Sequence, residues 1–287
     1  MLGGNNDVPA WNPVLVRSYK KNYDQTKNEP VYLQIASAKS NGVPKIQRLV
    51  FQDFLLADPK VLLFSAATRN AELMAVVKGS QTHEIFWQMP KTGESFTISG
   101  RLYMVAAPTM SHRFGAPPRR VTIGDSDIHP DEFWEQERLR QWKRLSPIYR
   151  ASFTWPAPGE SKHSLPKDGS SVYRASTVRL TGATGIDTGY KYTRLDAMDE
   201  NTGAATGLFG ALSGFVNGNG RAATNGSQLS KEEELRCVHN GALDNFCLLV
   251  MKAVKVDHWT PNTVAPPVRM LYEAMKDGSW TQEELNP

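Results

Sequence analysis

Two β-hairpin patterns constrain the fold of this chain more than any other feature of its sequence. The first consists of the apolar runs VYLQIASA (residues 31–38) and KIQRLVFQDF (residues 45–54) on either side of Asn41-Gly42. Asn-Gly favours the tight turn that joins two antiparallel strands, because both residues accept backbone conformations with positive φ. The first part of the chain is therefore expected to contain an antiparallel sheet.

A second hairpin pattern occupies residues 83–107. HEIFWQM and SFTISGRLYMVAA are joined by the turn sequence PKTGE, and Gly100 inside the later strand indicates a bulge or bend. Residues 245–260, NFCLLVMKAVKVDHWT, have the apolar character of a buried strand. Hairpins without a regular alternation of strands and helices predict a mainly β (α+β) fold, an antiparallel barrel or sandwich with peripheral helices.

Four segments have helical patterns. Residues 9–24 carry apolar side chains at near-helical spacing, residues 71–79 follow a strand-like run, and residues 131–146 have helical composition. The segment PPVRMLYEAMKDG (residues 266–278) is predicted to form a last helix that ends at Gly278.

The chain is predicted to form one domain with an insertion. Residues 202–227 are dense in Gly, Ala, Asn and Thr, and such a stretch buries too little apolar surface to offset the entropy lost on ordering. Residues 161–240 are therefore expected to be a low-complexity, mobile insertion. Residues 1–160 would form the first part of the domain, and the strands and helix of residues 241–287 would complete it.

The bulk composition limits the expected partners and compartment. Hydrophobic residues make up 40% and charged residues 22% of the 287 residues, an ordinary soluble balance. The net charge of +4 comes without a run of four or more Lys or Arg, so no nucleic-acid partner is expected. Two cysteines without CxxC spacing, no long apolar run and no signal-peptide pattern predict a cytoplasmic protein without a membrane partner.

The common catalytic motifs GxGxxG, GxxxxGK[ST], HExxH and GxSxG are missing from the sequence. The six histidines show no ligand-like spacing, so no metal site is predicted. Asp257 and His258 are neighbours in a predicted strand, where one side chain should point inward and the other outward. A cofactor that brings its own chemistry would explain the scarcity of catalytic side chains.

Residues 64–72, FSAATRNAE, lie where a strand gives way to a helix. The start of a helix can hold a phosphate, because its first backbone N–H groups lack helical partners and the helix dipole is positive there. Thr68 and Asn70 can add donors, and Arg69 can make a two-point contact with an anion. The alternative is an ordinary helix cap formed by Thr68 or Asn70, with Arg69 in water.

Five blocks of the sequence are informative when taken together: IQRLVFQDF, LLFSAATRN, IFWQMPKTGESFTISG, WKRLSPIYRASFTWPAPGE, and FCLLVMKAVKVDHWT with VRMLYEAM and LNP. Their content and order resemble the FMN-binding split barrels related to pyridoxamine 5'-phosphate oxidase. They cover nearly the whole chain apart from residues 160–240. The resemblance implies a six-stranded antiparallel split barrel, a homodimer with FMN at the subunit interface, and flavin redox chemistry on a small molecule.

The resemblance also implies which residues would bind the cofactor. The candidates are Arg69, Thr68, Asn70, Gln47, Arg48, Ser95 and Arg269. Arg69 falls on the family's phosphate-binding arginine, and Arg269 on a C-terminal arginine expected near the flavin. Gln47 and Ser95 stand where the family has an arginine and a glutamine, and Arg48 follows one position after Gln47.

Several polar contacts of the family are changed in this chain. The lysine that follows the family's phosphate-binding arginine is absent, and Glu72, which has the wrong charge for a phosphate, lies in that region. Arg48 would point to the opposite strand face from Gln47 unless a bulge intervenes. The leading hypothesis is an FMN-dependent oxidoreductase acting on a small molecule. The alternative is a split-barrel homodimer that has lost FMN and acts in binding or assembly.

Overall fold

The computed structural model of the protein describes residues 8–23, 29–38, 42–79, 82–110, 128–153, 157, 178–182, 190–194 and 239–287. Its elements in chain order are α1 (Trp11–Asn22), β1 (Val31–Ala38), β2 (Pro44–Leu55), β3 (Asp58–Ala67), α2 (Ala71–Gly79), β4 (His83–Gln88), β5 (Ser95–Val105), η1 (Pro108–Met110), α4 (Pro130–Arg144), α5 (Pro147–Ser152), β6 (Val178–Gly182), β7 (Tyr190–Arg194), β8 (Phe246–Thr260), β9 (Val268–Ala274) and β10 (Trp280–Leu285). The chain divides into two compact units, Met1–Arg138 with Cys247–Pro287, and Leu139–Phe246.

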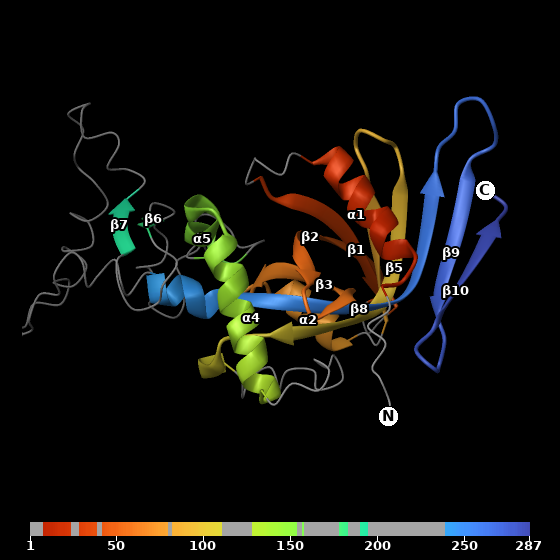
Figure 1. The fold of residues 1–287 in the computed structure, drawn as a ribbon. Coiled ribbons are helices and arrows are strands. Elements are labelled where there is room, and N and C mark those ends of the chain that lie inside the picture. Colours follow the sequence, from red (N-terminus) through yellow and green to blue (C-terminus); the bar gives the residue numbers. More distant parts are fainter. Residues whose placement is uncertain are drawn as a thin grey trace, which may run out of the picture. The chain divides into compact units, whose positions relative to one another are not determined.

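The first unit contains a closed β-barrel (Figure 1). Its strands follow the order β8-β3-β2-β1-β4-β5, and β5 pairs with β8 to close the ring. The pairings of β1 with β2 and β4, of β2 with β3, and of β5 with β4 and β8 are all antiparallel. β9 and β10 continue the sheet outward from β8. The prediction of a six-stranded antiparallel split barrel with peripheral helices is confirmed.

Strict alternation of side chains explains why β1 and β4 form strands of this barrel. Along both strands, a buried residue alternates with an exposed one. We name the side of Leu33 and Ile35, which are buried, the inner face of the sheet, and the opposite side the outer face. The predicted first hairpin is present between β1 and β2, and Gly42 in its turn has a φ of +79°.

The pairing of β5 with β8 is irregular at Gly100, where the sequence predicted a bulge or bend. The register shifts between Ser99 and Gly100. A Cβ atom on Gly100 would lie 2.4 Å from the backbone oxygen of Lys252. Only a residue without a side chain allows the two strands to approach this closely.

Gly100→Ala is expected to destabilise the protein by about 1–3 kcal/mol, because the two strands must separate to accommodate the methyl group. The melting temperature should fall by roughly 2–10 °C. Gly79→Ala is the matched control, since a Cβ atom at Gly79 meets nothing within 4 Å. Differential scanning calorimetry compares the two variants, and equal melting temperatures would contradict the steric account of Gly100.

The helix predicted for residues 266–278 is wrong, because this segment forms β9 and the start of a turn. β9 pairs with the second half of β8, and β10 pairs with β9. Gly278, with a φ of +88°, lies in the turn between β9 and β10, where its N–H donates to the carbonyl oxygen of Met275 at 3.0 Å. The edge of β8 supplies backbone partners for β9, and this tertiary pairing overrides the local helical preference.

The helix predicted at residues 9–24 is confirmed as α1. Trp11 is fully buried, and its ring lies 5.7 Å from that of Trp280 in β10. Tyr19 packs its ring against Trp87, which is also fully buried. α1 therefore contacts both the barrel core and the extension of the sheet by β9 and β10.

The helices predicted at residues 71–79 and 131–146 are confirmed as α2 and α4. Most of the predicted insertion at residues 161–240 lies outside the described residues, so its mobility and the predicted domain boundaries stay predictions. Within it, β6 and β7 form an antiparallel pair. None of the helices in the described ranges is both long and apolar enough to cross a membrane.

Candidate cofactor-binding site

The first candidate residues lie where β3 ends and α2 begins. Thr68 is buried, and Arg69 and Asn70 are half-buried. Asn70 caps the helix: its Oδ1 accepts the N–H of Leu73 at 3.1 Å, and its carbonyl oxygen accepts the N–H of Met74 at 2.9 Å. The cap alternative is thus confirmed for Asn70. The capping bond satisfies one N–H group of the first turn, and the positive end of the helix dipole lies directly after Thr68 and Arg69.

β2 places Gln47 and Arg48 on opposite faces. The register between β1 and β2 is unbroken along the whole of β1, so successive side chains alternate. Gln47 pairs with Ile35 and lies on the inner face, where its Oε1 is buried without a hydrogen-bond partner among the described residues. Arg48 is exposed on the outer face. The expected separation is confirmed, and no bulge brings the Arg48 side chain to the position of Gln47.

Lys45 adds a cation that the sequence analysis missed. It precedes Gln47 by two residues and therefore shares its face of β2. Its Nζ lies 2.9 Å from Oε2 of Glu72, the second residue of α2. No local sequence pattern indicates this contact, because β3 lies between the two residues in the chain. We name Lys45, Gln47 and residues 68–70 the helix-start group.

A second set of residues lies on the outer face of β5, β8 and β9. Ser95 pairs with Trp259, and Trp259 pairs with Arg269, so the three side chains form one row. The Arg269 guanidinium donates to Asp257 in β8, from Nη2 to Oδ2 at 2.7 Å and from Nε to both Oδ1 and Oδ2 at 3.1 Å. We name Ser95, Trp259 and Arg269 the outer-face group. Ser95 and Arg269 are candidates predicted from the sequence, whereas the aromatic ring of Trp259 between them is not.

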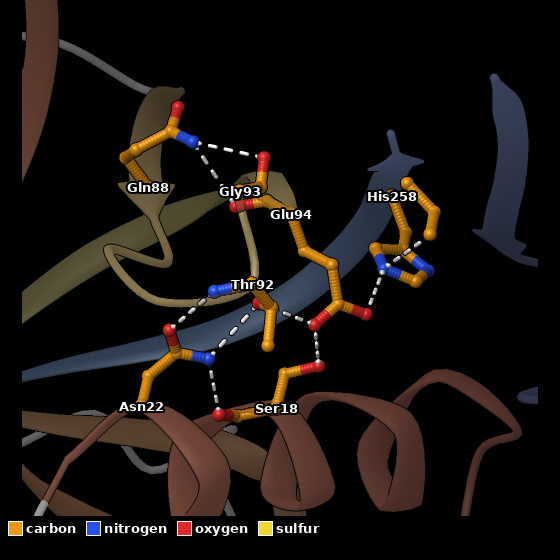
Figure 2. Close-up of polar contacts among 8 residues, drawn as sticks. Ser18, Asn22, Gln88, Thr92, Gly93, Glu94 and His258 are labelled. Atoms are coloured by element: carbon orange, nitrogen blue, oxygen red, sulfur yellow. Dashed lines mark hydrogen bonds and ion pairs between the residues drawn. The ribbon is translucent and has the colours of Figure 1, made fainter. Parts of the chain in front are cut away.

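A polar network lies behind the outer-face group (Figure 2). The carboxylate of Glu94 accepts hydrogen bonds from Ser18 Oγ at 2.7 Å and Thr92 Oγ1 at 2.8 Å. Its other oxygen lies 3.3 Å from Nε2 of His258. These residues come from α1, from the turn between β4 and β5, and from β8. The network therefore connects α1 to β8, which carries Trp259 of the outer-face group.

Strand alternation places Asp257 and His258 on opposite faces, as predicted. His258 is buried on the inner face, where its ring stacks on Phe96 with 4.2 Å between centroids. Burial lowers the pKa of His258, and the neighbouring Glu94 offsets only part of this effect. Burial also favours a higher pKa for Glu94, but the two hydroxyl donors and His258 outweigh it and the net pKa is lowered. An ionised Glu94 facing a neutral His258 is therefore the favoured state at neutral pH.

The helix-start and outer-face groups lie on different parts of the barrel within one subunit. Sγ of Cys247 donates to the carbonyl oxygen of Ala66 at 3.3 Å, which places the end of β3 beside the first residues of β8. Arg269, in contrast, is opposite Trp259 near the last residues of β8. Lys45 and Gln47 also face the opposite side of the sheet from Ser95 and Trp259. The two groups of one copy therefore lie on different faces of the barrel wall.

Among the described residues, neither Cys247 nor the possible metal ligands form a competing site. Burial raises the pKa of Cys247 to about 12, so this thiol stays protonated at neutral pH. In the part of the chain that the structure describes, no group of three or more His, Cys, Asp or Glu residues could hold a metal ion.

Comparisons with known proteins point to one family. Residues 8–106 match the family model described as pyridoxamine 5'-phosphate oxidase, FMN-binding domain. A pyridoxamine 5'-phosphate oxidase-related, FMN binding protein from Nostoc punctiforme PCC 73102 is 20% identical with a TM-score of 0.56, and the match covers 98% of this chain and 100% of that chain. PhzG from Burkholderia lata 383, solved in complex with tetrahydrophenazine-1-carboxylic acid, is 14% identical with a TM-score of 0.50. The match covers 100% of this chain and 98% of the PhzG chain. No curated protein matches the chain.

The matched segment contains the whole helix-start group, together with Arg48 and Ser95, whereas Arg269 lies beyond it. At their low sequence identity, the two solved structures establish a shared fold. The family match and the closed six-stranded barrel confirm the resemblance seen in the sequence. Residues 8–106 of this chain thus match the pyridoxamine 5'-phosphate oxidase FMN-binding domain family, and the whole chain shares its fold with the two solved structures.

Proposed function

We propose that the protein is a cytoplasmic homodimer that binds FMN and acts as an oxidoreductase on a small molecule. The observation that carries this proposal is the match of residues 8–106 to an FMN-binding domain, over a segment that contains the helix-start group. Bound FMN would supply a ring that accepts a hydride, which explains why the sequence lacks the common catalytic motifs.

The helix-start group fits the phosphate and sugar-alcohol parts of FMN. Arg69 and Lys45 supply positive charge, and the N-terminus of α2 adds its dipole and backbone N–H groups. Gln47 has a buried oxygen that lacks a hydrogen-bond donor among the described residues, and the hydroxyl groups of the ribityl chain are donors. These residues would hold FMN by charge and hydrogen bonds.

The separation of the two groups supports a site shared between two subunits. β2 and β5 are three strands apart in either direction around the barrel, and the two groups lie near opposite ends of β8. In one copy, Lys45 and Gln47 lie on the inner face of the sheet and the outer-face group lies on its outer face, so the sheet itself separates them. In a homodimer, the outer-face group of the second copy would complete the site, with Trp259 and Arg269 beside the flavin ring.

In this arrangement the residues of the chain bind and orient the cofactor. The helix-start group would fix the phosphate end, and the outer-face group would limit the position of the ring. Asp257 would hold the Arg269 guanidinium in a defined orientation, because it accepts hydrogen bonds from both Nε and Nη2. The closed barrel behind both groups gives them a rigid support.

We expect the purified protein to be yellow, to lose its colour with a chemical reductant, and to have a solution mass of twice 31.9 kDa. Adding about 1 mM FMN to the cofactor-free protein should raise its melting temperature, since binding stabilises the folded state. A colourless protein whose melting temperature does not change with FMN would contradict the proposal and favour the non-catalytic alternative. Light scattering tests the dimer, and a monomeric FMN-bound protein would contradict the shared site.

A further inference from the structure

We propose that Lys45 is a phosphate-binding residue of this chain, which Glu72 holds by an ion pair until FMN binds. This inference rests on the proposed FMN function and names a residue that the family resemblance does not supply. It also gives Glu72 a role as an internal anion that competes with the cofactor.

Lys45 lies beside the start of α2 in the folded chain. Lys45 comes from β2, and its Nζ contacts Oε2 of Glu72 at 2.9 Å in the first turn of α2. Arg69 precedes this turn directly, and Gln47 shares the face of β2 on which Lys45 lies. Lys45 therefore brings a positive charge from a distant part of the chain to the helix start that carries Arg69.

Glu72 and a bound phosphate would interact with the same helix dipole. A carboxylate in the first turn of a helix is stabilised by the helix dipole, and Glu72 occupies such a position. A phosphate at this helix start would experience the same dipole and would carry more negative charge than a carboxylate. The helix dipole that stabilises Glu72 would therefore also stabilise a phosphate, and Lys45 is the counter-ion of Glu72.

Lys45 can exchange the Glu72 carboxylate for a phosphate. The side chains of Lys45 and Glu72 are 29% and 63% exposed, and ion pairs this close to solvent contribute little to stability. A phosphate carries more negative charge than the Glu72 carboxylate and therefore attracts an ammonium group more strongly. The ammonium group of Lys45 can thus leave Glu72 for a phosphate at a small energetic cost.

The proposal explains how the helix start keeps sufficient positive charge. The lysine that the family has after its phosphate-binding arginine is absent from this chain, and Asn70 serves as the helix cap. Lys45 restores a second cation in space, although not in sequence.

The test compares FMN with riboflavin, which has the same ring and sugar alcohol but no phosphate. Flavin fluorescence measures both dissociation constants for the wild type, Lys45→Ala, Glu72→Gln and Lys255→Ala. Lys255 is the matched control because it forms an ion pair of 2.8 Å with Glu273 on the outer face. Thermal unfolding confirms that each variant is folded.

We expect Lys45→Ala to weaken FMN binding about tenfold and to leave riboflavin binding unchanged. Glu72→Gln should tighten FMN binding about two- to fivefold, because it frees Lys45 from its carboxylate partner. Lys255→Ala should bind both flavins like the wild type. If Lys45→Ala weakens both flavins equally or neither, while the wild type binds FMN, the role of Lys45 is refuted and the proposed function stands. If the wild type does not bind FMN, both proposals are refuted.

Discussion

Replacing Arg69 with alanine is expected to raise the dissociation constant for FMN by about 10–100-fold. A charge-assisted hydrogen bond to phosphate contributes about 1.5–3 kcal/mol, and each 1.4 kcal/mol corresponds to a tenfold change in affinity. Arg69 lies directly before the helix cap formed by Asn70, where an incoming phosphate would also interact with the helix dipole. Fluorescence titration of the cofactor-free variant with FMN measures the change.

Riboflavin separates a phosphate contact from a general loss of structure. Arg69→Ala should bind riboflavin within about twofold of the wild type, since only the phosphate interaction is removed. Arg101→Ala is the matched control, because Arg101 is exposed on β5 and its loss changes the net charge equally. An equal loss of affinity for both flavins would show that Arg69 does not act on the phosphate.

The same variant tests the shared site when it is mixed with Arg269→Ala. Each variant alone would lack one half of every site. Subunit exchange between the two would produce heterodimers in which one of the two sites has both arginines, so about a quarter of all sites should recover FMN binding. Recovery of no sites would contradict a site built from the helix-start group of one copy and the outer-face group of the other.

Replacing Glu94 with alanine is expected to destabilise the folded protein by about 3 kcal/mol, because a buried polar network loses its central acceptor. The side chains of Glu94 and His258 are only 12% and 7% exposed, so water cannot replace the lost contacts fully. The melting temperature should fall by roughly 6–12 °C. Differential scanning calorimetry measures the loss, and Glu283→Ala, on the exposed edge strand β10, is the control that should change little.

The contribution of Glu94 should also depend on pH in a defined direction. Because the folded-state pKa of Glu94 is lowered, its stabilising effect is complete above the ordinary glutamate pKa of about 4.3 and is lost as the pH falls through the lowered value. The lowered pKa of His258 affects stability at higher pH. As the pH falls below about 6.5, the unfolded chain binds the histidine proton before the folded protein does, and the folded state loses stability. Urea unfolding of wild type and Glu94→Gln below about pH 5 should therefore show a steeper loss for the wild type. Parallel curves would mean that Glu94 is not stabilised in its ionised form.

Much of the fold could be predicted from the sequence because its signals are local. Alternating apolar side chains predict β1 and β4, and the Asn-Gly turn predicts the hairpin that contains Gly42. Gly100 marks the irregular pairing of β5 with β8 because only glycine permits the contact with the backbone of Lys252. In each of these cases, the cause lies within a few residues of the effect.

The errors and omissions occur where distant segments meet. Residues 268–274 have a helical composition, yet they form β9 because the edge of β8 offers them backbone partners. Glu72 suggested only a charge unsuited to phosphate until the structure placed Lys45 beside it. Glu94 carried no signal in the sequence, since its partners Ser18 and His258 come from opposite ends of the chain.

The sequence by itself determined most of the strand and turn pattern and the family resemblance, and it limited the helix cap to Thr68 or Asn70. These features depend on side-chain periodicity and local hydrogen bonding. Only the tertiary structure decided which charges meet at the start of α2, and that the helix-start and outer-face groups lie near opposite ends of β8. Closing a barrel brings together residues that are distant in the chain, such as Lys45 and Glu72. The geometry of the proposed FMN site follows from that closure.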